Sequence, residues 1–448
     1  MRPRSTEALA AGDEVLAARA WVVAGRNAEK AGDGQASVRA LQDGFALAGR
    51  LGLDTVAADA ATAMVYTTGE MLRESAAAFA WGATAQMLVE RTGEDEGMRG
   101  ATLSGQLGTA HWRAAQYDQS IAMHERALEL KQRILGETHP SVAVTLFNLA
   151  NARDEQGDHD RALAQMLEAL AMFERELGPT HPSVANCANN LGSMAHVRGD
   201  LDEAVRWYER ALAIKEVNFG PESVQLTSTL GNLGNLELER GNIERARQLH
   251  ERALTLRRAR FGEQHLDVAD SISSLAKIAR TEGDLLGALR QQRAALEIRE
   301  RALPADHPDV IDSLLALALV HASLGEDATA RPLYERARAA AERRLGPDSL
   351  RVADALHGLA NVDRREGHHG EAVPLLERAL EIRERAKADL DLQATAREAL
   401  GYAVFDSGGE PSRARALLQR ARDDFAVSPD PRLRERAGGI DAWLAAHP

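Results

Sequence analysis

Histidines are the residues of this sequence with the most obvious chemistry, because an imidazole can bind a metal ion or transfer a proton. The sequence has 14 of them. Four follow a short loop at intervals of 42 residues or a multiple of 42: His139, His181, His265 and His307. One histidine per repeated unit places neighbouring side chains roughly 10 Å apart, which is too far for them to share a zinc ion. We therefore expect these four, and also His368 and His369, to cap helices and pack against loops.

Catalytic motifs are missing from the sequence. It contains no P-loop, no nucleophile elbow and no H-E-x-x-H motif. Asp and Glu total 67, but none lies in an apolar stretch that would raise its pKa for acid–base work. The single cysteine, Cys187, cannot form an internal disulfide, and we expect it to pack inside a helical layer. The sequence thus predicts no enzyme, no cofactor and no metal site.

The elements that carry these residues are repeats of 42 residues. An alanine, usually within Arg-Ala-Leu, returns at this interval at Ala127, Ala169, Ala211, Ala253, Ala295, Ala337, Ala379 and Ala421. A second series consists of glycines, at Gly157, Gly199, Gly241, Gly283, Gly325 and Gly367. Asp or Asn follows four of these glycines. Glycine suits the end of a helix and Asp or Asn the start of the next one, so each repeat is predicted to be a helical hairpin.

The His-Pro pair marks the first helix of each hairpin, because proline is well tolerated at the first helical position. In the unit that begins at Pro140 we predict helix A over 140–156 and helix B over 159–177. Small residues recur in helix A at Gly108, Ala150, Gly192, Gly234, Ala276, Ala318 and Ala360, and in helix B at Ser120, Ala162, Ala204, Ala246, Ala288, Ala330 and Ala372. They should let the two backbones approach closely. Leucines that directly precede the small helix A residues, such as Leu149, Leu191 and Leu233, are predicted to fill the core.

Composition agrees with an array of small contacts. Of the 448 residues, 44% are hydrophobic and only 4% are aromatic. The formal net charge of −13 argues against general binding to nucleic acid, which requires a basic surface. No run of about 18 apolar residues exists, and the N-terminus MRPRSTEALAAGD lacks the apolar core of a secretory signal. We expect a cytoplasmic protein without a membrane-inserted segment.

Taken together, these motifs resemble the tetratricopeptide repeat (TPR) in the long form found in kinesin light chains and in bacterial signalling proteins. The resemblance implies an all-α fold, a right-handed superhelix of about ten hairpins. We divide the chain into divergent hairpins at 1–95, eight 42-residue units at 96–428 and a capping helix at 429–448. The unit nearest the C-terminus is shifted by one residue, at Leu400 and the turn of Gly408 and Gly409. The divergent segment resembles the region that joins a bacterial serine/threonine kinase domain to its TPR array.

The resemblance also implies a ligand groove along the inner face of helix A. Residues mapped to this face are Asn148, Asn151, Asn189, Asn190, Asn232, Asn235, Lys277 and Arg280. Asparagine offers a donor and an acceptor to a peptide backbone. Alternatively, the asparagines bond neighbouring helices and maintain the shape of the array.

We therefore expect a scaffold that binds a protein or peptide segment in this groove, within bacterial signalling. The alternative is a regulatory or sensor module that controls a kinase or ATPase domain on another chain. Self-association, the partner and its motif stay open at this point.

Overall fold

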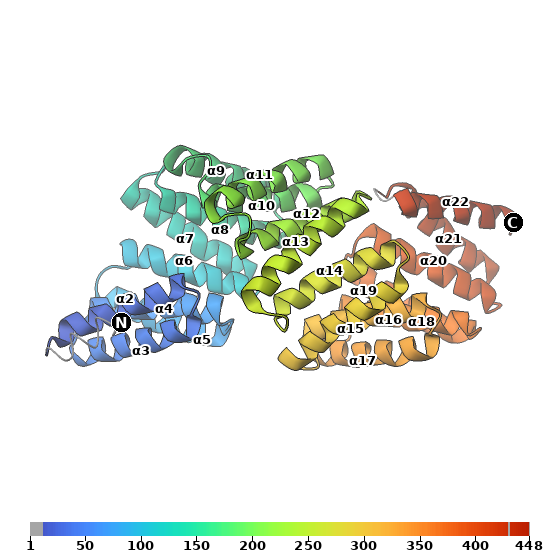
Figure 1. Cartoon of the computed structure of the whole chain (residues 1–448), viewed down its shortest axis with the longest axis horizontal. Coiled ribbons are helices and arrows are strands. Elements are labelled where there is room, and N and C mark those ends of the chain that lie inside the picture. The colour runs from blue at the N-terminus through green and yellow to red at the C-terminus, as the bar shows by residue number, and fades with distance from the viewer. Residues whose placement is uncertain (1–11, 429–430, 448) are drawn as a thin grey trace. The chain divides into compact units, whose positions relative to one another are not determined.

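The computed structural model describes residues 12–428 and 431–447, and within them every regular element is a helix (Figure 1). The all-α prediction is confirmed. The first eleven residues, Pro429, Asp430 and Pro448 lie outside the described part of the chain, and with them most of the N-terminal segment considered above. The chain forms two compact units, Met1–Asn218 and Phe219–Pro448.

The first unit consists of five helical hairpins, each packed on the next. They are α2 (Glu14–Lys30) with α3 (Gly34–Arg50), α4 (Asp54–Tyr66) with α5 (Ser75–Arg91), α6 (Met98–Arg113) with α7 (Tyr117–Leu135), α8 (Pro140–Gln156) with α9 (His159–Leu177), and α10 (Pro182–Val197) with α11 (Leu201–Phe219). A π-helical turn, η1 (Thr67–Met71), extends α4.

The second unit repeats this plan with five hairpins and one added helix. Its pairs are α12 (Thr227–Glu239) with α13 (Ile243–Phe261), α14 (Leu266–Thr281) with α15 (Leu285–Ala302), α16 (Pro308–Ser323) with α17 (Asp327–Leu345), α18 (Leu350–Arg365) with α19 (His369–Arg385), and α20 (Leu390–Asp406) with α21 (Pro411–Ala426). A 3-10 turn, η2 (Val224–Leu226), precedes α12, and α22 (Pro431–Ala446) packs on α21. The prediction of about ten hairpins is confirmed, and helices A and B of the unit at Pro140 have the predicted bounds.

The repeated histidines cap helices, as expected. The Nδ1 atom of His139 accepts a hydrogen bond from the backbone N–H of Ser141 at 3.0 Å. His181, His265 and His307 each accept the equivalent bond at 3.2 Å. The first N–H groups of a helix have no partner within the helix, so each ring replaces the usual Ser or Asp cap. At the other end of helix A, Gly157 adopts the left-handed conformation, with φ of 96°.

Within a hairpin, a large side chain of helix B packs against a position of helix A where glycine leaves room for it. A Cβ atom added to Gly192 would lie 2.8 Å from the ring of Tyr208, and one added to Gly234 would lie 2.6 Å from the ring of His250. The same relation joins Gly108 to His124. Where helix B carries the unbranched Met166, helix A has Ala150 at the matching position. The glycines are therefore required chiefly by rings, and not only by the small helix B residues that the sequence suggested.

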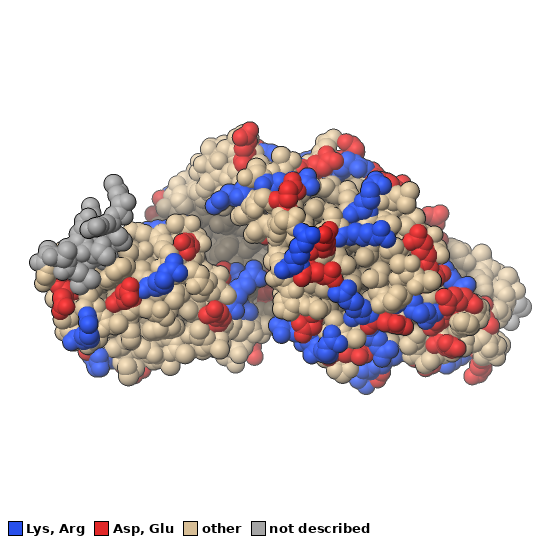
Figure 2. Space-filling model, turned by 60° about the horizontal axis from the view of Figure 1, so that its bottom comes forward, with Lys and Arg blue, Asp and Glu red and all other residues tan. Residues whose placement is uncertain are grey.

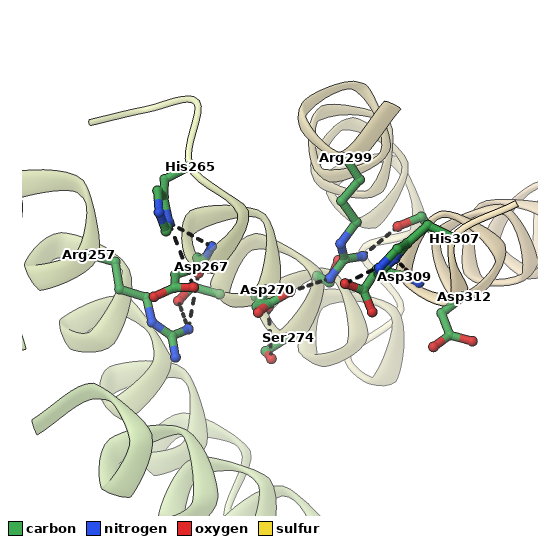
Figure 3. A network of polar contacts seen from close by, with 12 residues as sticks. Arg257, His265, Asp267, Asp270, Ser274, Arg299, His307, Asp309 and Asp312 are labelled. Carbon is green, nitrogen blue, oxygen red and sulfur yellow. Dashed lines mark hydrogen bonds and ion pairs between the residues drawn. The ribbon is translucent and has the colours of Figure 1, made fainter. Parts of the chain in front are cut away.

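A second contact joins one hairpin to the next through cations on helix B that are half-buried or buried. Lys131 donates to the Thr145 hydroxyl at 2.7 Å, and Arg257 donates to the Ser271 hydroxyl at 2.7 Å. Arg299, the next member of the series, donates in the same way to the Ser313 hydroxyl of the following helix A. Figure 3 shows its second partner, Asp270 of its own hairpin, at 2.6 Å. Each cation precedes its hydroxyl by 14 residues, so a helix B side chain is fixed to the following helix A.

Cys187 belongs to the same series. It occupies the hydroxyl position of its repeat, and the residue 14 positions earlier is Phe173 instead of a cation. Both are buried in one hydrophobic cluster. Burial raises the pKa of the Cys187 thiol to about 12. The expectation that this cysteine is packed in the interior is confirmed.

The divergent ends of the chain follow the same rules with local changes. Asp33 caps α3 through a 2.9 Å bond from the N–H of Ala36. In the last hairpin the glycine that faces helix B is Gly401, whose added Cβ would lie 2.7 Å from Leu418. This glycine comes one residue earlier than the 42-residue interval predicts, so the one-residue shift is confirmed. Trp443 of α22 packs edge-on against Tyr402 and Phe405.

The surface carries both signs of charge. On the face drawn in Figure 2, basic and acidic side chains are interspersed and form no single large patch. None of the described helices is both long enough and apolar enough to span a membrane.

Replacing Ala211 by Glu should destabilise the fold severely, because Ala211 is fully buried and a carboxylate there would lack a partner. The expected loss is several kcal/mol of unfolding free energy, on the order of 2–7. Denaturant titration measures it. Ala213 is exposed on the same helix, so Ala213→Glu serves as the control and should change stability by under about 0.5 kcal/mol. Equal effects of the two substitutions would contradict the packing described here.

Stability should also fall in mild acid because of buried histidines. Burial, and secondarily Lys131, lowers the pKa of His124 from 6.5 to about 4; burial, then Arg257 and Lys277, does the same for His250. Between pH 6.5 and pH 4 each of these histidines is protonated in the unfolded chain but neutral in the folded chain. The free energy of unfolding therefore decreases as pH falls from 6.5 towards 4. The loss is up to roughly 2 kcal/mol per histidine at pH 5.

The variant His124→Tyr/His250→Tyr tests this, since Tyr208 shows that tyrosine fits this position of the repeat. Chemical denaturation between pH 7 and pH 5 should give a flatter stability profile for the double variant than for the wild type. A profile of unchanged steepness would show that these two rings are not responsible.

Candidate functional site

The asparagines predicted for the groove fall in both units. Asn148 and Asn151 of α8 and Asn189 and Asn190 of α10 belong to the first unit, and Asn232 and Asn235 of α12 to the second. All of them except Asn235 are half-buried, and Asn235 is exposed. Each lies on a helix A, the helix that the TPR resemblance assigns to the inner face.

In the first unit two of these asparagines line a hollow of about 400 Å³. Its walls come from consecutive A helices: Tyr66 of α4, Glu70 of η1, Thr109, Trp112 and Arg113 of α6, and Phe147, Asn148 and Asn151 of α8, with His124 of α7 behind them. Aromatic walls with a few polar groups are typical of ligand pockets. The hollow is electrically balanced, because Arg113 forms an ion pair with Glu70.

The four asparagines of this unit differ in their side-chain hydrogen bonds. The Asn190 amide nitrogen donates to the Asn151 oxygen at 2.8 Å, and so joins α10 to α8. Asn189 donates weakly to Asn190 at 3.5 Å. Among the described residues Asn148 has no side-chain hydrogen bond. The structure thus gives Asn151 and Asn190 the bridging role that was the alternative interpretation, and leaves the Asn148 amide open to the hollow.

A further hollow of about 590 Å³ lies in the N-terminal hairpins and shares Tyr66 with the first. Its lining includes Glu29 of α2 and Arg99 of α6. Arg99 bonds Asp59 at 3.0 Å. Burial raises the pKa of Glu29, whereas a hydrogen bond from Thr67 opposes the shift. The expectation that no carboxyl would have a raised pKa is therefore wrong for Glu29, because α4 and η1 cover it and helical periodicity alone did not reveal that cover.

In the second unit Lys277 and Arg280 line a hollow of about 340 Å³. The walls are again two consecutive A helices, α14 and α16, and Gln292 and Arg299 of α15 lie behind them. Desolvation by the surrounding protein lowers the pKa of Lys277, and Arg280 lowers it further. The pKa of Arg280 is lowered for the same first reason, and Arg432 of α22 adds to the effect.

One group of residues has the composition of a metal site. Ligand atoms of Asp363, Glu366 and His368 lie within 4.8 Å of one another, next to the turn at Gly367. Arg331 already binds both carboxylates, at 2.7 Å and 2.6 Å. Because this guanidinium supplies the positive charge that a cation would bring, we assign no metal site to the group.

Sequence reasoning did not identify the aromatic walls of the first-unit hollow. Trp112 and Phe147 could have been predicted from the sequence, since both lie on helix A and Phe147 directly precedes Asn148. Tyr66 and Glu70 have none, because they lie where the π-helical turn departs from the repeat. Gln292 and Asp312 in the second unit were not predicted, because neither is an asparagine or a cation.

Comparisons with known proteins agree with this architecture. No curated protein matches the chain in sequence. Among solved structures, the apo form of the quorum sensor NprR from B. thuringiensis is 15% identical, with a TM-score of 0.60 over 81% of this chain and 97% of that one. The apo form of RapI is 14% identical, with a TM-score of 0.58 over 82% and 97%. At these identities the likeness concerns the fold alone.

A structure from Podosopora anserina, described as "putative kinesin light chain nearly identical TPR-like repeats", is 22% identical over 46% of this chain and 97% of that chain, with a TM-score of 0.40. The family model described as "Tetratricopeptide repeat" matches six overlapping stretches, at residues 99–175, 155–217, 225–301, 272–343, 309–385 and 351–425. These stretches cover more than half of the 448 residues. The chain is therefore a member of the tetratricopeptide repeat family.

Proposed function

We propose that this protein is an interaction scaffold that holds a peptide or protein segment against the exposed face of its A helices. One observation carries the proposal: in each unit a hollow lies between consecutive A helices, between α6 and α8 in the first and between α14 and α16 in the second. Each hollow includes residues that the repeat spacing had assigned to the groove. A peptide in such a hollow would meet amides and aromatic rings in the first unit and cations in the second.

The first-unit hollow suits a segment bound through its backbone. The Asn148 amide can donate and accept one bond each to a peptide group, and Trp112 and Phe147 provide apolar surface for a side chain. Because Arg113 and Glu70 neutralise each other, this part of the groove places no demand on the charge of the ligand. Such a surface reads an extended chain without requiring one sequence.

The placement of this scaffold in bacterial signalling, and in the cytoplasm, is likewise part of the proposal, as is the absence of catalysis. No feature of the described residues favours the alternative, a regulatory module for a kinase or ATPase domain on another chain, over the scaffold.

Affinity capture of partners from the source organism, followed by crosslinking, tests the proposal through two single variants. Asn148→Ala should reduce capture several-fold, because it removes the amide that is open to the hollow, and should leave the melting temperature unchanged. Asn190→Ala should instead lower stability by about 0.5–1.5 kcal/mol, since it breaks the bond to Asn151.

The triple variant Asn148→Ala/Asn190→Ala/Asn232→Ala extends this test to both units and should abolish most capture. Undiminished capture by the triple variant, together with a large loss of stability, would show that these asparagines only support the fold.

A further inference from the structure

One carboxylate of the N-terminal hairpins has no cation paired with it. Glu29 lies on α2 and lines the hollow of about 590 Å³, whose walls come from the consecutive A helices α2, α4 and α6. The other acidic residues of that lining, Asp59 and Glu94, are both paired with Arg99, at 3.0 Å and 3.4 Å. Within the described residues Glu29 forms no ion pair, although it is half-buried.

Neutral hydroxyl groups hold the Glu29 carboxylate in place. Thr67, the first residue of the π-helical turn η1, donates to Glu29 Oε1 at 2.5 Å, and the Ser37 hydroxyl lies 3.1 Å from the Thr67 hydroxyl. Thr67 and Ser37 are both fully buried. These hydroxyls fix the direction of the carboxylate, and they add no positive charge.

The ionised form of Glu29 is therefore only partly stabilised. Burial raises the pKa of Glu29, and the bond from Thr67, the charge of Arg26 and the Ser37 hydroxyl offset part of that shift. A carboxylate that loses water without gaining a paired cation is unfavourable, and a cation brought by a ligand relieves that cost.

Burial also decides which sign of ligand charge the hollow prefers. Its lining has three cations, Arg26, Lys30 and Arg99, and three carboxylates, so the formal charges cancel. Arg99 is neutralised by its two pairs, and Arg26 and Lys30 are exposed, where water and salt screen their charge. Glu29 is half-buried, and a charge acts more strongly where the dielectric constant is lower. The hollow therefore favours a cation over an anion.

Tyr66 connects this hollow to the one that contains Asn148. Tyr66 lines both hollows, which therefore adjoin at α4 within the first unit. A segment whose backbone lies against Asn148 can thus extend towards Glu29. With roughly 10 Å between packed helices, the two steps from α4 to α8 correspond to about six residues of an extended chain.

We propose that Glu29 binds a primary ammonium group of the segment that lies in the groove, in the hollow along α2, α4 and α6. This inference rests on the proposed groove function and adds the chemistry of one ligand group. Two sources supply such a group, the free N-terminus of the segment and a lysine side chain near that end. Either ammonium donates to the Glu29 carboxylate, in a bond that is roughly twice as strong as one between neutral groups.

Fluorescence anisotropy with the full chain tests the inference. The probe is an alanine–serine peptide of about ten residues, with a leucine about six residues from its N-terminus for the apolar surface of Trp112 and Phe147. Fluorescein is attached at its C-terminus. Its match is acetylated at the N-terminus. We expect the free peptide to bind at least about tenfold more tightly than the acetylated one, a difference of about 1.4 kcal/mol.

A third peptide distinguishes the two sources of the ammonium. It is acetylated at the N-terminus and begins with lysine. Affinity equal to that of the free peptide would assign the site to a lysine side chain, and affinity equal to that of the acetylated peptide would assign it to the N-terminus.

Glu29→Gln should remove the preference for the free peptide, because glutamine can still accept the Thr67 bond but has no charge. It should leave the affinity of the acetylated peptide unchanged. The matched control is Glu14→Gln, which removes an exposed carboxylate from the first turn of the same helix and should keep the preference. Thermal melting of both variants verifies folding, and the comparison of the free and acetylated peptides on the wild-type chain needs no variant.

Four results would overturn the inference: equal affinity of the free and acetylated peptides, a preference that survives Glu29→Gln, a preference that Glu14→Gln removes as well, or no binding of the free peptide at about 1 mM. Asn148→Ala separates this inference from the proposed function. Peptide binding and partner capture that need Asn148 but show no ammonium preference would retain the scaffold and remove the ammonium site. A preference that persists while Asn148→Ala changes neither peptide affinity nor capture would retain the ammonium site and remove the segment at Asn148.

Discussion

The structure depends on one steric constraint within the hairpins, the match between a larger helix B side chain and a glycine or alanine on helix A. Tyr208 and His250 occupy space that any Cβ at Gly192 or Gly234 would fill. The ring fits only where the glycine of helix A faces helix B. This contact therefore sets the rotation of helix A about its own axis, and with it the side chains of helix A that point away from helix B. The exposed face with its asparagines and cations is a consequence of this internal packing.

The contact between hairpins determines how charge is distributed. The cation of helix B donates to a hydroxyl on the next helix A, as Arg299 does at Ser313, and Arg299 also bonds Asp270 of its own hairpin. Repeats without the cation lack the hydroxyl too: Phe173 is followed by Cys187, and Ala341 by Ala355 at the same offset of 14 residues. A pairing that changes on both sides at once indicates a real packing contact.

Much of the fold could be predicted from the sequence, because a 42-residue interval repeats the same turn, cap and core residues many times. The helix bounds of the unit at Pro140, the histidine caps and the one-residue shift near Gly401 all follow from that interval. The π-helical turn after Tyr66 and the cover over Glu29 could not be predicted, since both lie in hairpins that depart from it. Asn190 differs from Asn148 because its amide bonds Asn151, 39 positions away. No local sequence pattern specifies that bond.

In the function proposed above, a partner lies against the exposed face of the A helices, within each unit. Site-specific photo-crosslinking measures this most directly, with a benzophenone side chain introduced in place of Phe147 in the first-unit hollow, or in place of Leu167, which is 42% exposed on helix B. A partner held in the hollow should crosslink from position 147 and not from position 167. Crosslinking from position 167 alone would place the partner on helix B and contradict the account.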